Sequence, residues 1–190
     1  MGFGNSSSDA AGSSSAVGSS SSLGSADEEL SDYARLDDGR HRTSILFVEA
    51  DCAFVAPLAV AASEMIHPTM LRASMASSSA VAPLHPLLER VLEERVRLPS
   101  VALARKPLSS IQPSARLDWV VSFDEASRVA ADTWVASASA AGAVAAGKLR
   151  RIHQDFGAGL AADASWVQAD ALGLKIKEFV SELPDLLSMM

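Results

Sequence analysis

The spacing of apolar and polar residues divides the chain into a polar beginning and an apolar remainder. Residues 5–25 are almost entirely Ser, Gly and Ala, and an acidic stretch, SADEELSDYARLDD, follows them. Such segments cannot bury enough apolar surface to offset the entropy of ordering them. The pattern therefore predicts a disordered, solvated tail over residues 1–42.

The next segment, 43–82, begins apolar and becomes Ser-rich toward its end. Its run Ile45–Val48 is typical of a strand, because β-branched and aromatic residues favour strands. The alanines between 50 and 62 favour a helix, which Pro57 would interrupt. We predict a helix here, with a strand at the start as the alternative, and a loop over the serines.

Helical spacing is clearest in 83–190, which we interpret as a helical assembly region. The stretch LHPLLERVLEERVRL places its apolar residues on one helical face, between Pro86 in the first turn and Pro99 beyond the end. In 115–157, apolar and small residues recur every three or four positions, which predicts one seam along a long helix. A further helix is predicted from Asp163 to 183, before Pro184.

These elements predict an all-α protein. A disordered tail precedes short helices and then a long C-terminal helix or a helical hairpin of coiled-coil type, and the pattern leaves hairpin and rod both open. A helix this long must share its apolar seam with a neighbour. The side chains expected to form this partner interface are Val120, Phe123, Trp134, Leu149, Ile152, Phe156, Trp166, Ile176 and Phe179.

Composition and charge restrict the class of protein. The formal net charge of −7 offers no basic surface to nucleic acid as a whole. Cys52 is the only cysteine, which excludes an internal disulfide framework and fits a cytosolic setting. Charged residues and Pro57 interrupt the longest apolar stretch, so no membrane-spanning helix is expected.

The sequence gives no catalytic pattern that we can identify. The four histidines, His41, His67, His85 and His153, are scattered without metal-ligand spacing, so no metal and no cofactor are expected. The stretch GAVAAG (142–147) lacks the Lys-Ser/Thr ending of a phosphate loop. We predict that the chain is not an enzyme, the alternative being an enzyme of unfamiliar type whose histidines and acids converge in a pocket.

The opening MGFGNS fits the pattern for N-myristoylation at Gly2. One myristoyl chain binds membranes only weakly, with an association constant on the order of 10⁴ per molar. No cysteine lies near Gly2 and no basic residue precedes Arg35. We therefore expect partner subunits to supply the remaining membrane affinity.

Several stretches resemble the myrlysin family, the lipidated subunits of the lysosome-positioning complex BORC. They are Gly2 with the Ser-rich tail, HPLLERVL (85–92), RLDW (116–119), KLRRIHQDF (148–156) and LPDLLSMM (183–190). The resemblance implies a non-catalytic adaptor, lipid-anchored on the cytosolic face of lysosomes or vacuoles. It would join other small helical subunits and recruit an Arf-like GTPase and kinesin. The alternative is a soluble helical scaffold subunit of another cytosolic assembly, cytoskeletal or ribosomal, without lipid.

Overall fold

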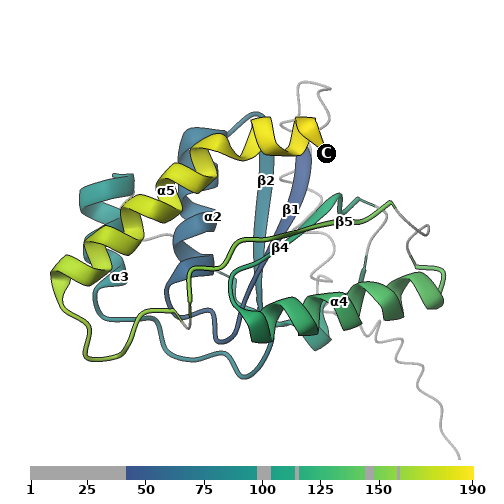
Figure 1. Cartoon of the computed structure of the whole chain (residues 1–190), viewed down its shortest axis with the longest axis horizontal. Helices are drawn as coiled ribbons and strands as arrows, with labels where there is room; N and C mark the ends of the chain where they lie inside the picture. The colour runs from purple at the N-terminus through teal and green to yellow at the C-terminus, as the bar shows by residue number, and fades with distance from the viewer. Residues whose placement is uncertain (1–41, 98–103, 114–115, 144–147, 158) are drawn as a thin grey trace, which may run out of the picture. The chain divides into compact units, whose positions relative to one another are not determined.

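The computed structural model describes residues 42–97, 104–113, 116–143, 148–157 and 159–190. Gly2 and the predicted tail up to residue 41 lie outside these ranges. The described part contains a five-stranded, all-parallel sheet in the order β3-β2-β1-β4-β5 (Figure 1). None of its helices is long and apolar enough to cross a membrane.

The elements alternate along the chain in the manner of an α/β protein. The strands are β1 (Thr43–Glu49), β2 (Leu71–Ser77), β3 (Lys106–Pro107), β4 (Trp119–Ser122) and β5 (Arg150–His153). The helices are α2 (Val55–Ile66), α3 (Leu88–Val91) with a π-helical turn at Leu92–Val96, a 3₁₀ turn at Leu108–Ser110, α4 (Glu125–Ala140) and α5 (Trp166–Met189).

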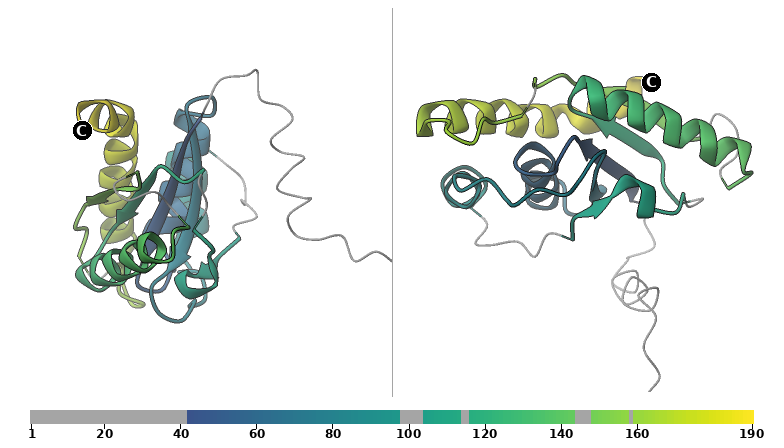
Figure 2. Two further views of the ribbon diagram at one scale, coloured as in Figure 1. Left: turned by 90° about the vertical axis from the view of Figure 1, so that its right-hand side faces the viewer. Right: turned by 90° about the horizontal axis from the view of Figure 1, so that it is seen from below.

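Helices cover both faces of the sheet. Ile45 and Phe47 of β1 belong to a core that includes α2 and α5, whereas Leu46 and Val48 belong to a second core beneath α4. Figures 1 and 2 show α5 lying across α2, with α4 separate from this pair. A strand buried on both faces is apolar at every position rather than at alternate ones, which explains the continuous run of β1.

The central strand β1 is also where the direction of winding reverses. From β1 the chain passes through α2 to β2 on one side, and later returns to β4 on the other side. Because α2 and α4 pack on opposite faces, the carboxyl ends of β1 and β4 border a topological switch point. Ligands of open α/β sheets bind in the crevice at such a point.

The predicted all-α fold is wrong, and the long helix over 115–157 is its largest error. That segment contains β4, α4 and β5. The strands β4 and β5 are only four residues each, so their few apolar residues fall by chance onto helical spacing. The helix α4 begins at Asp124, whose side chain accepts a hydrogen bond from the Ser127 N–H at 2.7 Å, and Gly142 follows its end with a φ of 69°.

The predicted helix at the start of 43–82 is also wrong, because the strand alternative is what the structure shows. The alanine-rich part does form α2. The loop predicted over the serines is wrong at its start, because residues 72–77 belong to β2, which pairs with β1. Pro57 does not interrupt this helix, since it lies in the first turn, where its missing N–H would have no helical partner.

The two remaining helices are confirmed, with corrected ends. The stretch 84–98 contains α3 and its π-helical turn. Helix α5 is capped by Ser165 and Gln168 rather than by Asp163, and it continues through Pro184. Proline removes the N–H that would bond the Val180 carbonyl. His67 Nε2 lies 3.1 Å from that carbonyl oxygen and donates to it instead.

Candidate functional site

A buried carboxylate lies at the switch point, at the carboxyl end of β1. The Val55 N–H donates to Glu49 Oε1 at 3.0 Å, and the Ala56 N–H donates to Glu49 Oε2 at 2.9 Å. Glu49 is only 3% exposed. Both of its oxygens are therefore held by the backbone of the first turn of α2.

The first turn of α2 has no other cap. The residue before the helix is Phe54, and no side chain at that position bonds the free N–H groups. The N-terminus of a helix attracts anions because its N–H groups and its dipole point the same way. Cys52, in the connecting loop, has a left-handed φ of 54°, and such a residue helps successive N–H groups to face one anion. Glu49 is thus the anionic group that satisfies the free N–H groups at the start of α2.

The environment of Glu49 places its titration near neutral pH. Burial and, to a smaller extent, the nearby Asp51 charge raise the pKa of this carboxyl from 4.5 to about 7. The Ala56 and Val55 N–H groups lower the pKa, but not enough to offset burial. Glu49 can thus gain or lose a proton near neutral pH, as a general acid or base does.

The segment after β5 covers the carboxylate. Gly159 has a φ of 78°, and a Cβ atom built there would lie 3.4 Å from Glu49 Oε1. His85 Nε2 lies 3.0 Å from the Ala161 carbonyl oxygen, and its Nδ1 accepts from the Leu87 N–H at 3.2 Å. His85 therefore carries its proton on Nε2 and ties this segment to the chain before α3.

Asp124 joins the loop to the second half of the sheet. Its Oδ2 accepts from the Ala50 N–H at 2.9 Å, and its Oδ1 caps α4 through Ser127. One carboxylate thus fixes the first residue after β1 and the start of α4. This contact positions both sides of the switch point.

Cys52 lies in the same loop but is not suited to thiolate chemistry. It is fully buried, and burial, together with the Glu49 charge, raises the pKa of its thiol to about 12. The reactive form of cysteine is the thiolate, which needs an electropositive and partly exposed setting. Of the other charged neighbours, Asp51 raises this pKa too, and Arg105 lowers it without offsetting the rise.

The described histidines are not brought to one another, but His85 lies beside the loop, where its backbone N–H donates to the Ala53 carbonyl oxygen at 3.0 Å and its ring packs edge-on against Phe54. His67 bonds α5, His85 bonds Ala161, and His153 Nδ1 lies 3.0 Å from Ser122 Oγ on the neighbouring strand. His41 lies outside the described residues, as do 144–147 of the GAVAAG stretch. Among the described residues, no three metal-ligating side chains come together.

The residues predicted to form a partner interface are divided between the two cores of this chain. Phe123, Phe156 and Phe179 form one aromatic cluster, with ring centroids 5.5 to 6.2 Å apart. Ile176 is buried in the same core, and Ile152 and Trp166 pack against it.

The other three predicted interface residues lie on the α4 side of the sheet. Val120 and Leu149 are buried there. Trp134 is partly buried, and its Nε1 donates to the Ile111 carbonyl oxygen at 3.2 Å. The described structure therefore packs all of these side chains within the chain itself.

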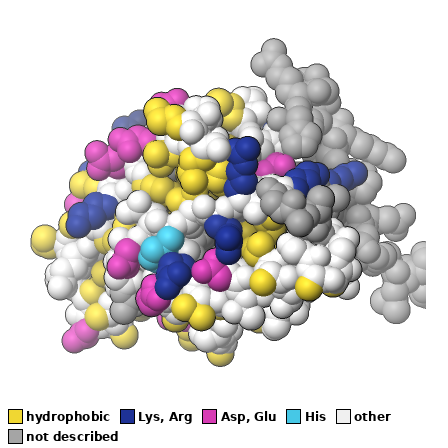
Figure 3. Space-filling view, turned by 45° about the vertical axis from the view of Figure 1, so that its right-hand side comes forward, with side chains coloured by type: hydrophobic (Ala, Val, Ile, Leu, Met, Phe, Trp, Pro, Cys, Tyr) yellow, Lys and Arg dark blue, Asp and Glu magenta, His cyan; other side chains and the backbone are white. Residues whose placement is uncertain are grey.

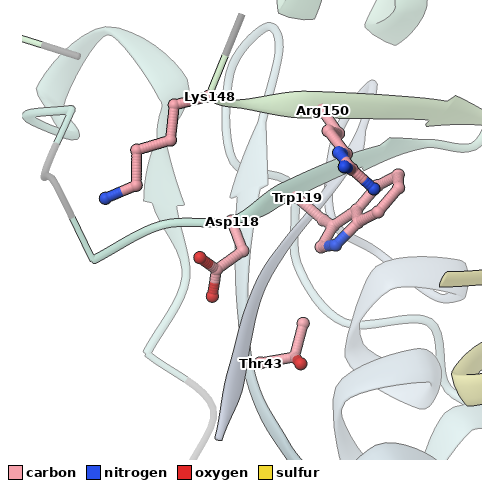
Figure 4. Close-up of a pocket in the computed structure, with 5 residues that line it drawn as sticks. All are labelled: Thr43, Asp118, Trp119, Lys148 and Arg150. Atoms are coloured by element: carbon pink, nitrogen blue, oxygen red, sulfur yellow. The ribbon is translucent and has the colours of Figure 1, made fainter. Parts of the chain in front are cut away.

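A shallow hollow lies at the opposite, amino-terminal ends of the strands. Figure 4 shows its lining residues, Thr43, Asp118, Trp119, Lys148 and Arg150, around a volume of about 290 Å³. Arg150 lies over Trp119, 5.3 Å from the ring centroid, and Asp118 accepts from the Ser44 N–H at 2.9 Å. The surface in Figure 3 mixes acidic and basic side chains around hydrophobic ones, without a field of one sign.

The strand order and the helices on both faces of the sheet define a doubly wound α/β protein. No protein-family model and no curated protein matches the chain. Solved structures do. An arsenate reductase in the phosphate-binding state is 14% identical, with a TM-score of 0.52 over 74% of this chain and 95% of that one.

Two further structures agree with this result. A thioredoxin-dependent arsenate reductase from Corynebacterium glutamicum is 14% identical, with a TM-score of 0.53 over 86% of this chain and 71% of that one. A mutant of YwlE from Bacillus subtilis is 14% identical, with a TM-score of 0.54 over 77% of this chain and 99% of that one. The chain therefore shares the α/β fold of these three structures.

These likenesses overturn the predicted identity and function. The chain resembles proteins of an enzyme fold, so the myrlysin resemblance, the adaptor function and the helical-scaffold alternative are wrong. The prediction that the chain is not an enzyme is overturned by the same neighbours. Acylation of Gly2, the lysosomal location and the partner subunits are tested by none of these findings and stay predictions.

Sequence reasoning missed Glu49, which it noted only as a charge that interrupts an apolar stretch. A usable signal was present. An uninterrupted apolar run ends at Glu49, a short connection, ADCAF, follows, and a helix begins within six residues. In a strand–loop–helix unit, that loop is where anions bind.

Proposed function

We propose that this chain binds a tetrahedral oxyanion of the phosphate class at the loop between β1 and α2. The observation that carries the proposal is the pair of N–H groups from Val55 and Ala56, which converge on one carboxylate at the start of an otherwise uncapped helix. A phosphate or arsenate ion presents oxygens that the same donors can bond. The similar arsenate reductase structure is described as phosphate-bound.

Thiol-based reduction is not part of this proposal. It requires a thiolate at the bound anion. Cys52 is buried with a strongly raised pKa, and the chain has no second cysteine. The function that the geometry supports is therefore recognition of the oxyanion itself or of a group that carries it.

A titration with inorganic phosphate tests this function. Added phosphate should shift the amide resonances of Val55 and Ala56 in ¹H–¹⁵N spectra, since these N–H groups would donate to it. Amides of the amino-terminal hollow, such as those of Trp119 and Arg150, serve as the internal control and should not move. Saturable shifts only at the hollow, or none anywhere, would contradict the proposal.

The carboxyl group of Glu49 favours a second candidate, hydrolysis of phosphate esters. With a pKa of about 7, the Glu49 carboxylate can take the proton of a water molecule that attacks phosphorus. The ester oxygen then leaves as a phenolate, or as an alcohol when it takes the proton that Glu49 received. p-Nitrophenyl phosphate is the probe: Glu49→Gln should abolish turnover, whereas Glu64→Gln, at the far end of the same helix, should retain it.

A further inference from the structure

The amino-terminal edge of the sheet gathers basic side chains from several strands. The strands begin together there, since Thr43 lies opposite Leu71, and Trp119 lies opposite both Ile45 and Arg150. At or close to these strand starts lie Arg42, Arg72, Arg116, Lys148 and Arg150. All of them except the partly buried Arg42 are exposed, so they are accessible to a surface that approaches this edge.

The hollow at this edge has a charged half and an apolar half. Figure 4 shows the charged half, where the side chains of Lys148 and Arg150 extend from the chain at the start of β5. Arg150, Thr43 and Trp119 also line an adjoining hollow of about 220 Å³. Its other lining residues are mostly apolar and are Met70, Leu71, Pro184, Leu187 and Ser188. Arg150 therefore stands between a place for an anionic group and a place for an apolar one.

Exposed apolar side chains border the same hollow. Met70 is 52% exposed, and Leu186 and Met189, on either side of the lining residue Leu187, are 37% and 81% exposed. Hydrophobic side chains lie directly beside basic ones on the surface in Figure 3. Methionine is flexible enough to adapt to an irregular partner. Basic side chains next to exposed apolar ones are the combination that binds the interface of an anionic bilayer.

We propose that this edge is a contact surface for a bilayer that contains anionic lipids. The lipid headgroups meet Lys148 and Arg150, and the exposed apolar side chains reach the boundary of the acyl chains. This surface lies at the opposite ends of the strands from the oxyanion site and does not depend on it. The chain that precedes Arg42 leads from this edge to Gly2, the predicted acylation site. One acyl chain anchors a protein only weakly, and a basic patch is a second signal that makes anchoring stable.

Acidic side chains limit the attraction to anionic lipid. Asp118 is the only acidic residue at the strand starts that the structure describes on this edge, and it accepts from the Ser44 N–H. Glu64, Glu182 and Asp185 are exposed near the ends of α2 and α5. Exposed charges act over about 10 Å at about 0.1 M salt, so the side chains at the contact matter more than the net charge. The adjoining apolar groups favour a bilayer over a nucleic acid, whose phosphates attract charge alone.

Sedimentation with lipid vesicles tests this surface. The full chain, without acylation, is mixed with vesicles of phosphatidylcholine alone and with vesicles that also contain phosphatidylserine. The chain should sediment only with the second kind, and high salt should release it, because the attraction between exposed charges is screened. Equal binding to both kinds, or binding to neither, would overturn the proposal.

A matched pair of variants separates the edge from the net charge. Lys148→Gln combined with Arg150→Gln should weaken binding by about thirtyfold, since each basic residue near an anionic surface contributes a factor of about five. The control combines Arg97→Gln, after the π-helical turn, with Lys175→Gln, in the middle of α5, and removes the same charge from exposed positions. The control should bind like the wild type. An equal loss in both variants would show that net charge alone decides, and would overturn the proposal.

A measurement on the wild type covers the case in which the edge variant does not fold. Bicelles that contain phosphatidylserine should broaden the amide resonances of Leu71 and Arg150 more than those of Leu88 and Val91 in α3. Broadening centred on α3 would overturn the proposal. Binding of an oligonucleotide in place of the vesicles would also overturn it and assign the edge to nucleic acid.

Discussion

At the scale of single residues, Glu49 and Cys52 show how burial changes the chemistry of a side chain. Both belong to the loop between β1 and α2, and burial raises the pKa of each. For the carboxyl group this moves titration into the neutral range, where the group is useful. For the thiol it moves titration away from that range, so the only cysteine is chemically inert.

The inertness of Cys52 predicts slow labelling by thiol reagents. The native chain should react with a disulfide reagent about a hundredfold more slowly than the chain unfolded in urea, because the thiolate is scarce and the side chain is buried. The reaction is followed by release of the chromophore at neutral pH. Equal rates in the native and unfolded chains would show that the loop exposes Cys52.

At the scale of elements, α5 contains a proline that sequence reasoning treated as the end of the helix. Pro184 leaves the Val180 carbonyl without its helical donor, and His67, at the end of α2, supplies one. A side chain far away in the sequence therefore allows the helix to continue. The helix needs this contact because an unpaired buried carbonyl costs about 1–3 kcal/mol.

This account predicts that His67→Ala destabilises the chain by about 1–3 kcal/mol in urea unfolding, as the Val180 carbonyl loses its donor. The control is the same substitution in a Pro184→Ala background, where the restored N–H can bond that carbonyl. His67→Ala should cost clearly less there. An equal cost in both backgrounds would mean that His67 acts through packing and not through the carbonyl.

At the scale of the whole molecule, the raised pKa of Glu49 couples folding to pH. The carboxyl group binds a proton more tightly in the folded chain, with a pKa of about 7, than in the unfolded chain, with a pKa of 4.5. The stability that this group contributes is therefore fully present below about pH 4.5 and is lost as the pH rises to about 7. The shift corresponds to a change on the order of 3 kcal/mol.

The measurement is the free energy of unfolding of the wild type minus that of Glu49→Gln, followed from about pH 5 to about pH 8. This difference should fall as the pH rises, whereas the matching difference for Glu64→Gln should change much less. Taking the difference between the two proteins cancels the pH dependence that both share, such as that of Asp170, whose pKa is lowered by Arg95. A difference that rises with pH would mean that Glu49 is ionised throughout.

The sequence by itself determined the features that depend on neighbouring residues. The helix of 84–98 and the existence of α5 follow from local periodicity, and the run Ile45–Val48 indicated a strand as one of two alternatives. Short apolar runs could not be assigned in this way. Whether the residues of β4 and β5 form strands or part of a helix depends on β1 lying beside β4 and on β4 lying beside β5.

Only the tertiary structure decided the fold class and the site. The chemical properties of the Glu49 carboxylate depend on two contacts. The backbone turn brings the Val55 and Ala56 N–H groups to its oxygens, and the segment around Gly159 shields it from water. Neither the hydrogen bonds to the backbone nor the burial that raises the pKa can be recognised in the amino-acid sequence. They arise when segments far apart in the chain meet, because desolvation and electrostatic contact depend on distance in space and not on position along the chain.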